Sequence, residues 1–163
     1  MPVPKFKFRD LNMTLAPVAH LARKSPEAFN KACKVGVVQF LTWCNTGSKG
    51  SSKKPPIRWG VLRGSGSGFV GNELVVIFEI PIKAGRATPA RSHSAKPTTM
   101  TWCWNTDYAA KMHEWTGGWG PFTLQDGNAG NQWLAEHLRA DAQALYDVIG
   151  MKFSQVMKFR SGG

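Results

Sequence analysis

The chain has 163 residues, of which 42% are hydrophobic and 19% charged, and we expect one soluble domain around a single core. No stretch approaches the roughly 18 apolar residues of a membrane span, so the sequence predicts no membrane-spanning helix. The formal net charge of +11 predicts an anionic neighbour, either nucleic acid or an acidic protein surface. The three cysteines, Cys33, Cys44 and Cys103, match no zinc spacing, which favours reduced and partly buried thiols.

The first part of the chain predicts an arm followed by two helices. Residues 1–10 contain two prolines and little apolar periodicity, and they lack the apolar run of a secretory signal, so we expect an extended arm. A short helix is expected to begin at Pro17. The triplet Ser25-Pro26-Glu27 combines an N-cap, a first-turn proline and an acid, and predicts a helix that ends near Trp43. Its buried face is expected to carry Phe29, Cys33, Gly36 or Val37, Phe40 and Cys44.

Residues 45–56 form a basic segment that is rich in glycine and serine. Such a composition cannot bury a core, and it predicts a mobile loop. One interpretation is a solvated loop, and the other is a contact loop for a partner or for DNA through Lys49, Lys53 and Lys54.

The middle of the chain carries the strand candidates. Residues 58–63 predict a short strand or turn, and the glycine-rich residues 64–68 predict flexible backbone. Residues 69–82 form the clearest strand region, with a turn at 72–73. Because 74–80 is a continuous run of mostly apolar and β-branched residues, we expect both faces of this strand to be covered.

A second basic loop, residues 83–97, follows this strand. Loops of this length are uncommon in compact domains, and this one is a second candidate for contact with a partner or DNA, through Lys83, Arg86, Arg91 and Lys96. Residues 98–104 alternate as a strand does, and we expect them to pair with 74–80 in a long-armed hairpin.

The last part of the chain predicts two helices. Asp107 is expected to cap a short helix over 108–115, and a glycine-rich turn follows. Residues 131–159 have apolar side chains at helical spacing and predict one helix of about eight turns, with a bend or close backbone approach at Gly150. Residues 160–163 are expected to fray. The chain therefore predicts a single α+β domain over 1–163, in which a small antiparallel sheet packs against an N-terminal helix and a long C-terminal helix.

The sequence offers no constellation typical of catalysis. Residues 66–71 satisfy G-x-G-x-x-G, but a strand follows them instead of the helix that a dinucleotide site needs. His113-Glu114 lacks the second histidine of a zinc protease, because position 117 is glycine. The scattered histidines and cysteines form no nucleophile set, so we expect neither an enzyme nor a cofactor or metal. The seven tryptophans favour a core or interface role over base stacking.

Three short motifs occur in order along the chain. The first is Trp59-Gly60-Val61-Leu62-Arg63-Gly64-Ser65, after the first long helix, in which Gly60 and Arg63 suggest a turn and an anchoring guanidinium. The second combines Tyr108-Ala109 with His113-Glu114. The third is Gly130-Asn131-Gln132-Trp133-Leu134, ahead of the final helix. Together the motifs resemble those of the tail-completion, or head-to-tail joining, proteins of tailed bacteriophages, a family that includes neck and minor capsid proteins.

The resemblance implies a non-enzymatic virion protein of the neck or upper tail, made in the host cytoplasm. It implies a closed homo-oligomeric ring, hexameric or of higher symmetry, between portal-side and tail-tube proteins, with DNA passing through it and no membrane partner. A minor capsid role is an alternative within the same class. A free basic nucleic-acid-binding protein, using lysine and arginine loops and tryptophan stacking, is the alternative from another class.

Overall fold

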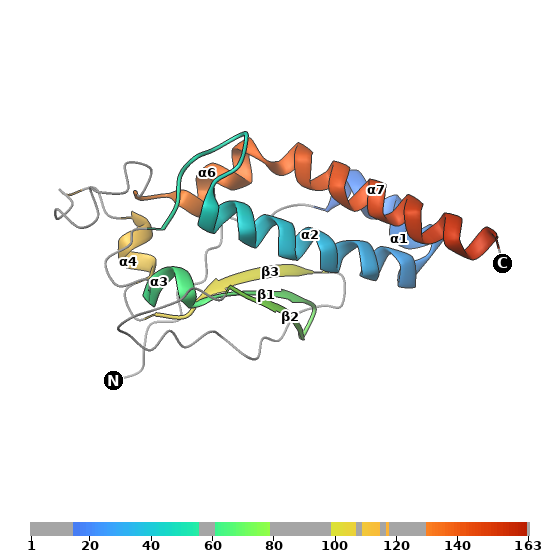
Figure 1. Cartoon of the computed structure of the whole chain (residues 1–163), viewed down its shortest axis with the longest axis horizontal. Helices are drawn as coiled ribbons and strands as arrows, with labels where there is room; N and C mark the ends of the chain where they lie inside the picture. The colour runs from blue at the N-terminus through green and yellow to red at the C-terminus, as the bar shows by residue number, and fades with distance from the viewer. Residues whose placement is uncertain are drawn as a thin grey trace.

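The computed structural model describes residues 15–55, 61–78, 99–106, 109–114, 117 and 130–162. A three-stranded antiparallel sheet lies against one side of a long helix, α2, and a second long helix, α7, lies against the other side (Figure 1). This arrangement confirms the predicted α+β class. The elements in chain order are η1 (Ala16–Val18), α1 (Ala19–Lys24), α2 (Pro26–Thr46), α3 (Val61–Gly64), β1 (Gly66–Val70), β2 (Glu73–Ile77), β3 (Met100–Trp104), α4 (Ala109–Glu114), α6 (Trp133–Ala140) and α7 (Ala142–Ser161).

The start of α2 is the one that the sequence predicts. Ser25 is the N-cap, and its hydroxyl oxygen accepts a hydrogen bond from the Ala28 amide at 3.3 Å. The helix continues past the expected end at Trp43 and stops at Gly47, whose φ of 91° favours glycine. The Gly47 amide there donates to the Trp43 carbonyl at 2.8 Å.

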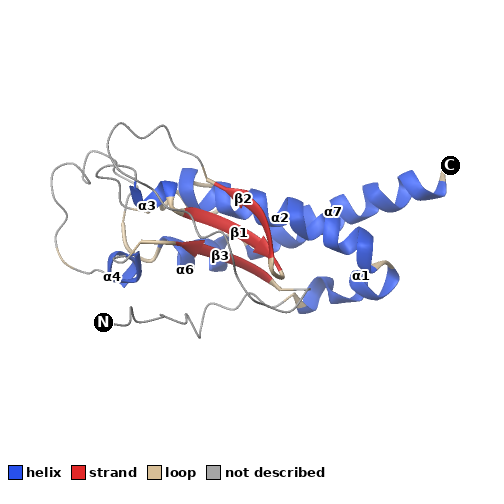
Figure 2. Ribbon diagram, turned by 90° about the horizontal axis from the view of Figure 1, so that it is seen from below, coloured by secondary structure: helices blue, strands red, loops and turns tan. Residues whose placement is uncertain are grey.

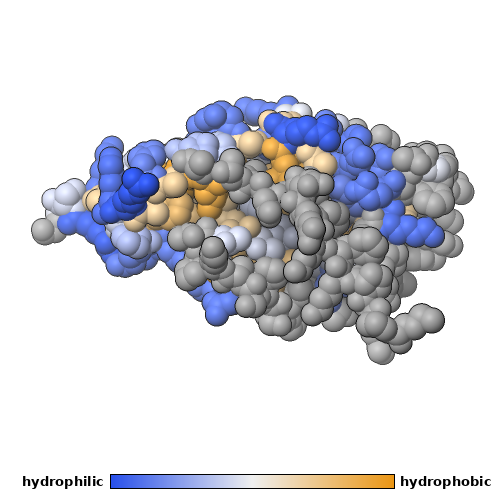
Figure 3. Space-filling model, turned by 180° about the vertical axis from the view of Figure 1, so that it is seen from behind, coloured by the Kyte–Doolittle hydropathy of each residue, from blue (hydrophilic) through white to orange (hydrophobic). Residues whose placement is uncertain are grey.

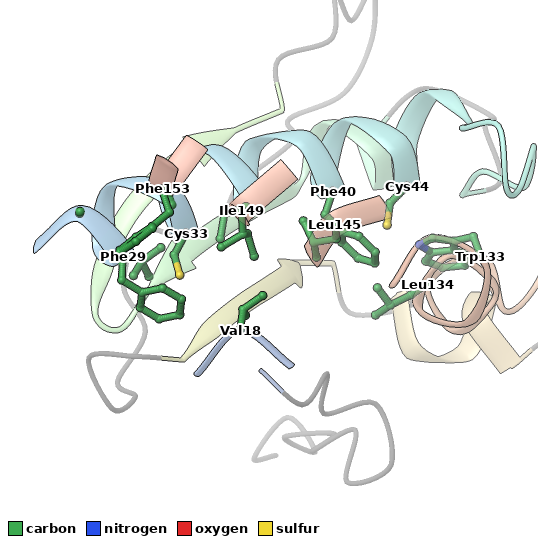
Figure 4. Packing of buried hydrophobic residues seen from close by; sticks show 14 of the residues in the cluster. Val18, Phe29, Cys33, Phe40, Cys44, Trp133, Leu134, Leu145, Ile149 and Phe153 are labelled. Atoms are coloured by element: carbon green, nitrogen blue, oxygen red, sulfur yellow. The ribbon is translucent and has the colours of Figure 1, made fainter. Parts of the chain in front are cut away.

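The core lies on both sides of α2, which is why this helix is buried along two faces (Figure 4). Towards α7 the two helices approach closely, because a methyl group on Gly36 would lie 2.9 Å from Cγ1 of Ile149. The sequence predicted either a bend or a close backbone approach at Gly150, and the close approach is wrong, since a methyl group there would meet nothing within 4 Å. The buried hydrophobic residues of the cluster include Phe29, Cys33, Val37, Phe40, Cys44, Trp133, Leu134, Leu145, Ile149 and Phe153.

The strands pair in the order β2-β1-β3, with β1 in the centre (Figure 2). A turn at Gly71 and Asn72 joins β1 to β2, one residue before the predicted position at 72–73, because Glu73 already pairs with Val70 as the first residue of β2. The predicted pairing of 98–104 with 74–80 is wrong, because β3 pairs with β1 along its whole length, from Gly66 opposite Trp104 to Val70 opposite Met100. The cause of the error is the glycine-rich segment, which was expected to be flexible but supplies the central strand.

Burial of the strands also differs from the expectation. All five residues of β1 are buried, whereas the apolar strand β2 is only partly buried and its first residue, Glu73, is exposed. The prediction that both faces of 74–80 are covered is therefore wrong for β2, which lies at an edge of the three-stranded sheet. Lys34 of α2 reaches this edge and donates to Glu73 Oε1 at 2.7 Å.

The C-terminal segment is two helices rather than the one predicted over 131–159. Asp141 separates α6 from α7, and its φ of −109° and ψ of 2° depart from helical values. In the segment that the sequence expected to fray, α7 includes Arg160 and Ser161, and Arg160 forms an ion pair with Glu27 of α2. In the middle of the chain, residues 61–64 form the short helix α3 instead of a strand or turn.

Candidate functional site

The described part of the first motif is fixed to the loop that follows α2. Arg63 of α3 is only 8% exposed, and its Nε donates to the Pro55 carbonyl at 2.8 Å. A buried guanidinium needs such acceptors, so this contact fits the anchoring role expected of Arg63. Ser65 is buried and its hydroxyl donates to the carbonyl of Leu62, itself a core residue, at 2.7 Å. Gly60 lies outside the described residues.

The second motif contributes α4, whose inner face carries His113. This ring is buried, and its edge meets the Trp133 ring at a centroid distance of 4.9 Å and an angle of 75°. Nδ1 of His113 lies 2.6 Å from Oε1 of Glu114, whose own side chain is largely exposed. Ala109 packs against the core at the start of α4, and its amide donates to the Thr106 carbonyl at 3.1 Å. Tyr108 lies outside the described residues.

The third motif connects α4 and the α2 loop to the final helices. The Gln132 amide donates to the His113 carbonyl at 2.6 Å, and the Gly130 amide donates to the Lys54 carbonyl at 3.2 Å. Gln132 has a φ of 50° and turns the chain into α6, where Trp133 and Leu134 enter the core. Left-handed backbone at a residue other than glycine indicates a turn that its surroundings hold in place.

The three motifs therefore meet at one end of the sheet, where Figure 1 shows α3, α4 and α6 close together. The link between the first and third motifs passes through two consecutive carbonyls, since Pro55 accepts from Arg63 and Lys54 accepts from Gly130. The link between the first motif and β3 is the hydrogen bond from the Asn105 amide to the Ser65 carbonyl at 3.3 Å. We name this region, formed by the described parts of the three motifs, the motif junction.

The chemistry of the motif junction is that of a structural tie. Its buried polar groups, Arg63, Ser65 and His113, contact backbone carbonyls, a carboxylate and an aromatic ring. Across the described ranges, no three His, Cys, Asp or Glu side chains gather in a way that could hold a metal ion. The arrangement can join segments that are distant in sequence, which is how buried hydrogen-bonded groups fix the relative position of elements.

The first basic loop is held in place along its described length, residues 47–55. The Ser48 hydroxyl lies 2.8 and 2.7 Å from the two carboxylate oxygens of Asp141, and His137 Nε2 lies 2.7 Å from the Lys53 carbonyl. The prediction of a mobile loop is wrong here, because serine and backbone groups supply the contacts that apolar side chains do not. Lys49 is exposed, and Lys53 and Lys54 are half-buried. The second basic loop, with Lys83, Arg86, Arg91 and Lys96, lies outside the described residues.

Sequence reasoning missed the side chains that hold this loop. His137 and Asp141 are four residues apart and are both buried, with His137 Nδ1 2.5 Å from Asp141 Oδ2. The spacing of four in a helical pattern is a signal that was present, because such residues share a helix face. Nothing in the sequence pointed to Ser48, which is 93 positions from Asp141.

Four of the tryptophans, Trp43, Trp102, Trp104 and Trp133, lie in or against the core. Trp102 Nε1 donates to the Val37 carbonyl at 3.0 Å, Trp104 Nε1 lies 3.2 Å from Asn45 Oδ1, and Trp133 is buried. Trp104 and Trp133 pack edge to face at 6.2 Å. The core interpretation holds for these four.

The cysteines are free thiols, as the sequence predicted. Burial raises the pKa of Cys33 to about 12 and raises that of Cys103. The pKa of Cys44 is raised well above its ordinary value, first by burial and then by the charge of Asp141. All three side chains therefore stay protonated at neutral pH.

None of the described helices is long and apolar enough to cross a membrane. Comparison of the chain with models of known families, with curated proteins and with solved structures finds no match in any of the three.

Proposed function

We propose that this protein is a non-enzymatic structural component of a tailed-bacteriophage virion, at the neck or upper tail, which assembles head to tail into a closed ring. The observation that carries the proposal is the motif junction. Three motifs that resemble those of the joining proteins, and that are far apart in sequence, are tied together by hydrogen bonds and a ring contact. Residues with a shared structural task are expected to meet in this way.

Surface side chains on the long helices supply contacts that an assembly can use. Val35 and Val38 of α2 and Met151 and Phe159 of α7 are exposed, and Phe159 is 89% exposed. On the face in Figure 3, apolar side chains lie between hydrophilic ones. A head-to-tail contact joins two different surfaces of the same chain, so apolar groups on one element can meet another face of the next subunit.

The test is assembly of the purified protein with its neighbours. Light scattering after size separation gives the mass of the protein alone, and co-sedimentation gives its binding to isolated tails or portal-bearing heads. The proposal expects a discrete oligomer, or a monomer that joins one of these particles. A monomer that stays out of both particles would contradict it.

Charge favours a second candidate function, that of a free nucleic-acid-binding protein. The net charge of +11 belongs to the whole chain, and the exposed Lys49 lies on a loop that the structure holds in place. Binding of this kind weakens steeply with salt, because each phosphate contact releases counterions. A salt titration with a DNA oligonucleotide tests it, and binding that is absent or insensitive to salt would eliminate this candidate.

A further inference from the structure

We propose that His137 and Asp141 form a proton-dependent clamp that holds the loop over 47–55 against the junction of α6 and α7. The clamp consists of the His137 ring, the Asp141 carboxylate, the Ser48 hydroxyl and the Lys53 carbonyl. It is independent of the phage assignment, because it concerns only contacts within one chain.

The hydrogen-bond partners of His137 define how many protons the buried pair holds. Nε2 lies 2.7 Å from the Lys53 carbonyl oxygen, which can only accept, so Nε2 must donate. Nδ1 lies 2.5 Å from Asp141 Oδ2. One proton must lie between Nδ1 and Oδ2, because a carboxylate oxygen and an unprotonated ring nitrogen both only accept. His137 and Asp141 are therefore joined by one shared proton, and both side chains are buried.

Burial makes the pair sensitive to the loss of the shared proton. His137 is 0% exposed and Asp141 is 3% exposed, so a charge left without its partner would remain in a poorly solvated site. From α2, Cys44 faces the pair and stays a neutral thiol, because burial and the charge of Asp141 both raise its pKa. Phe40 of α2 adds an uncharged ring edge, 6.4 Å from the His137 ring centre. The loop contributes a hydroxyl from Ser48 and a carbonyl from Lys53.

The loop is attached to the helices through these same groups. Ser48 also accepts hydrogen bonds from the Gly50 and Ser51 amides, at 3.1 and 2.9 Å, so one side chain orders the turn that Asp141 holds. A methyl group at Gly50 would overlap Asp141 Oδ1 and lie 2.9 Å from the Ala140 carbonyl oxygen. The backbone therefore lies directly against the helix junction, and any change at Asp141 reaches it.

The direction of the pH effect follows from the proton that lies between Nδ1 and Oδ2. When the pair loses this proton as pH rises, two acceptors face each other, and either the Asp141 or the Lys53 contact of His137 is lost. The loop is therefore held on the acid side of this step and loosened on the basic side. The change reaches residues 48–53, whereas the carbonyls of Lys54 and Pro55 stay bonded to Gly130 and Arg63.

Nuclear magnetic resonance of the wild-type protein tests the clamp without any variant. The ¹⁵N resonances of the His137 ring report the number of nitrogen-bound protons, and the Gly50 and Ser51 amide resonances report the loop. On the acid side of one pH step we expect a proton on Nε2 and a second proton shared between Nδ1 and Asp141, and we expect the amide resonances to shift in the same step. A ring without a proton on Nε2, or loop resonances that stay constant through the step at His137, would overturn the proposal.

Two variants separate the clamp from general effects of pH. His137→Gln keeps a polar side chain without the titrating charge, and we expect the amide shifts at Gly50 and Ser51 to lose their pH step. His20→Gln is the matched control, because His20 is exposed on α1 and should leave the step unchanged. A step that survives in His137→Gln, or disappears in His20→Gln, would contradict the clamp.

Discussion

Gly68 of β1 lies directly beneath Val37 of α2, so closely that a methyl group on Gly68 would overlap Cγ1 of Val37. The same methyl group would lie 3.0 Å from Cγ1 of Val76 on the neighbouring strand. The central strand is thus glycine-rich because α2 packs onto its backbone, which explains how a segment of low strand propensity becomes the centre of the sheet.

The Gly68→Ala variant should destabilise the protein by about 1–3 kcal/mol, the usual cost of overpacking a core. The Gly150→Ala variant is the matched control, because Gly150 lies within α7 with space around it. Alanine at position 150 should stabilise the protein by about 0.5–1 kcal/mol, because alanine has a higher helix propensity than glycine. Urea unfolding of both proteins measures the difference, and equal effects at the two sites would refute the close approach.

The Arg63→Lys variant should weaken the motif junction. Lysine lacks the Nε donor that bonds to the Pro55 carbonyl, and Arg63 is buried, so we expect a loss of about 1–3 kcal/mol in the free energy of unfolding. Arg23→Lys is the control, since Arg23 is exposed on α1. Chemical denaturation distinguishes the two, and a variant at Arg63 as stable as the control would show that this contact does not hold the junction.

The pKa of Glu27 should depend on Arg160, which lies in the last turn of α7. Hydrogen bonds from Arg160 and then Lys31 lower the pKa of this carboxyl below its ordinary value. A lowered pKa means that the ion pair adds stability above the unfolded-state pKa and loses it as pH falls through the folded-state value. Arg160→Gln should raise the Glu27 pKa measured by nuclear magnetic resonance, whereas Lys158→Gln should leave it nearly unchanged. An equal Glu27 pKa in both variants would show that the end of α7 does not contact Glu27.

The thiols should react slowly in the folded protein. The thiolate is the reactive form, and burial raises the pKa of Cys33 to about 12 and that of Cys44 well above its ordinary value. A thiol-specific chromogenic reagent at pH 8 should modify these two side chains only after addition of denaturant. Rapid modification of Cys33 or Cys44 under native conditions would contradict their burial.

Local signals in the sequence were sufficient for the start of α2 and, to within one residue, for the turn between β1 and β2. Ser25 and Pro26 identify the start of α2 because capping depends on neighbouring residues alone, and the turn after β1 uses Gly71, whose φ is 59°. The central strand was missed because its stability comes from α2, whose contact with Gly68 has no local sequence signature. The break at Asp141 was missed because a buried hydrogen-bond contact with His137 and a distant serine stabilise it.

The candidate site was predictable only in part. The three motifs were identified in the sequence, but the link between the first and the third depends on the backbone carbonyls of residues 54 and 55, which are present whatever the side chains are. The basic loop was identified by composition, and its attachment was not, because hydrogen bonds from Ser48 replace apolar burial. Long-range polar contacts of this kind produce no periodic pattern in the sequence.

Electron microscopy of the assembled protein, alone or on isolated tails or portal-bearing heads, tests ring formation most directly. Averaged images give the symmetry of the assembly and the surfaces that adjacent subunits share. We expect a closed ring of six or more subunits in which each subunit offers two different surfaces to its neighbours. A two-fold dimer with identical contacting surfaces, or an assembly of no defined symmetry, would contradict the proposed role.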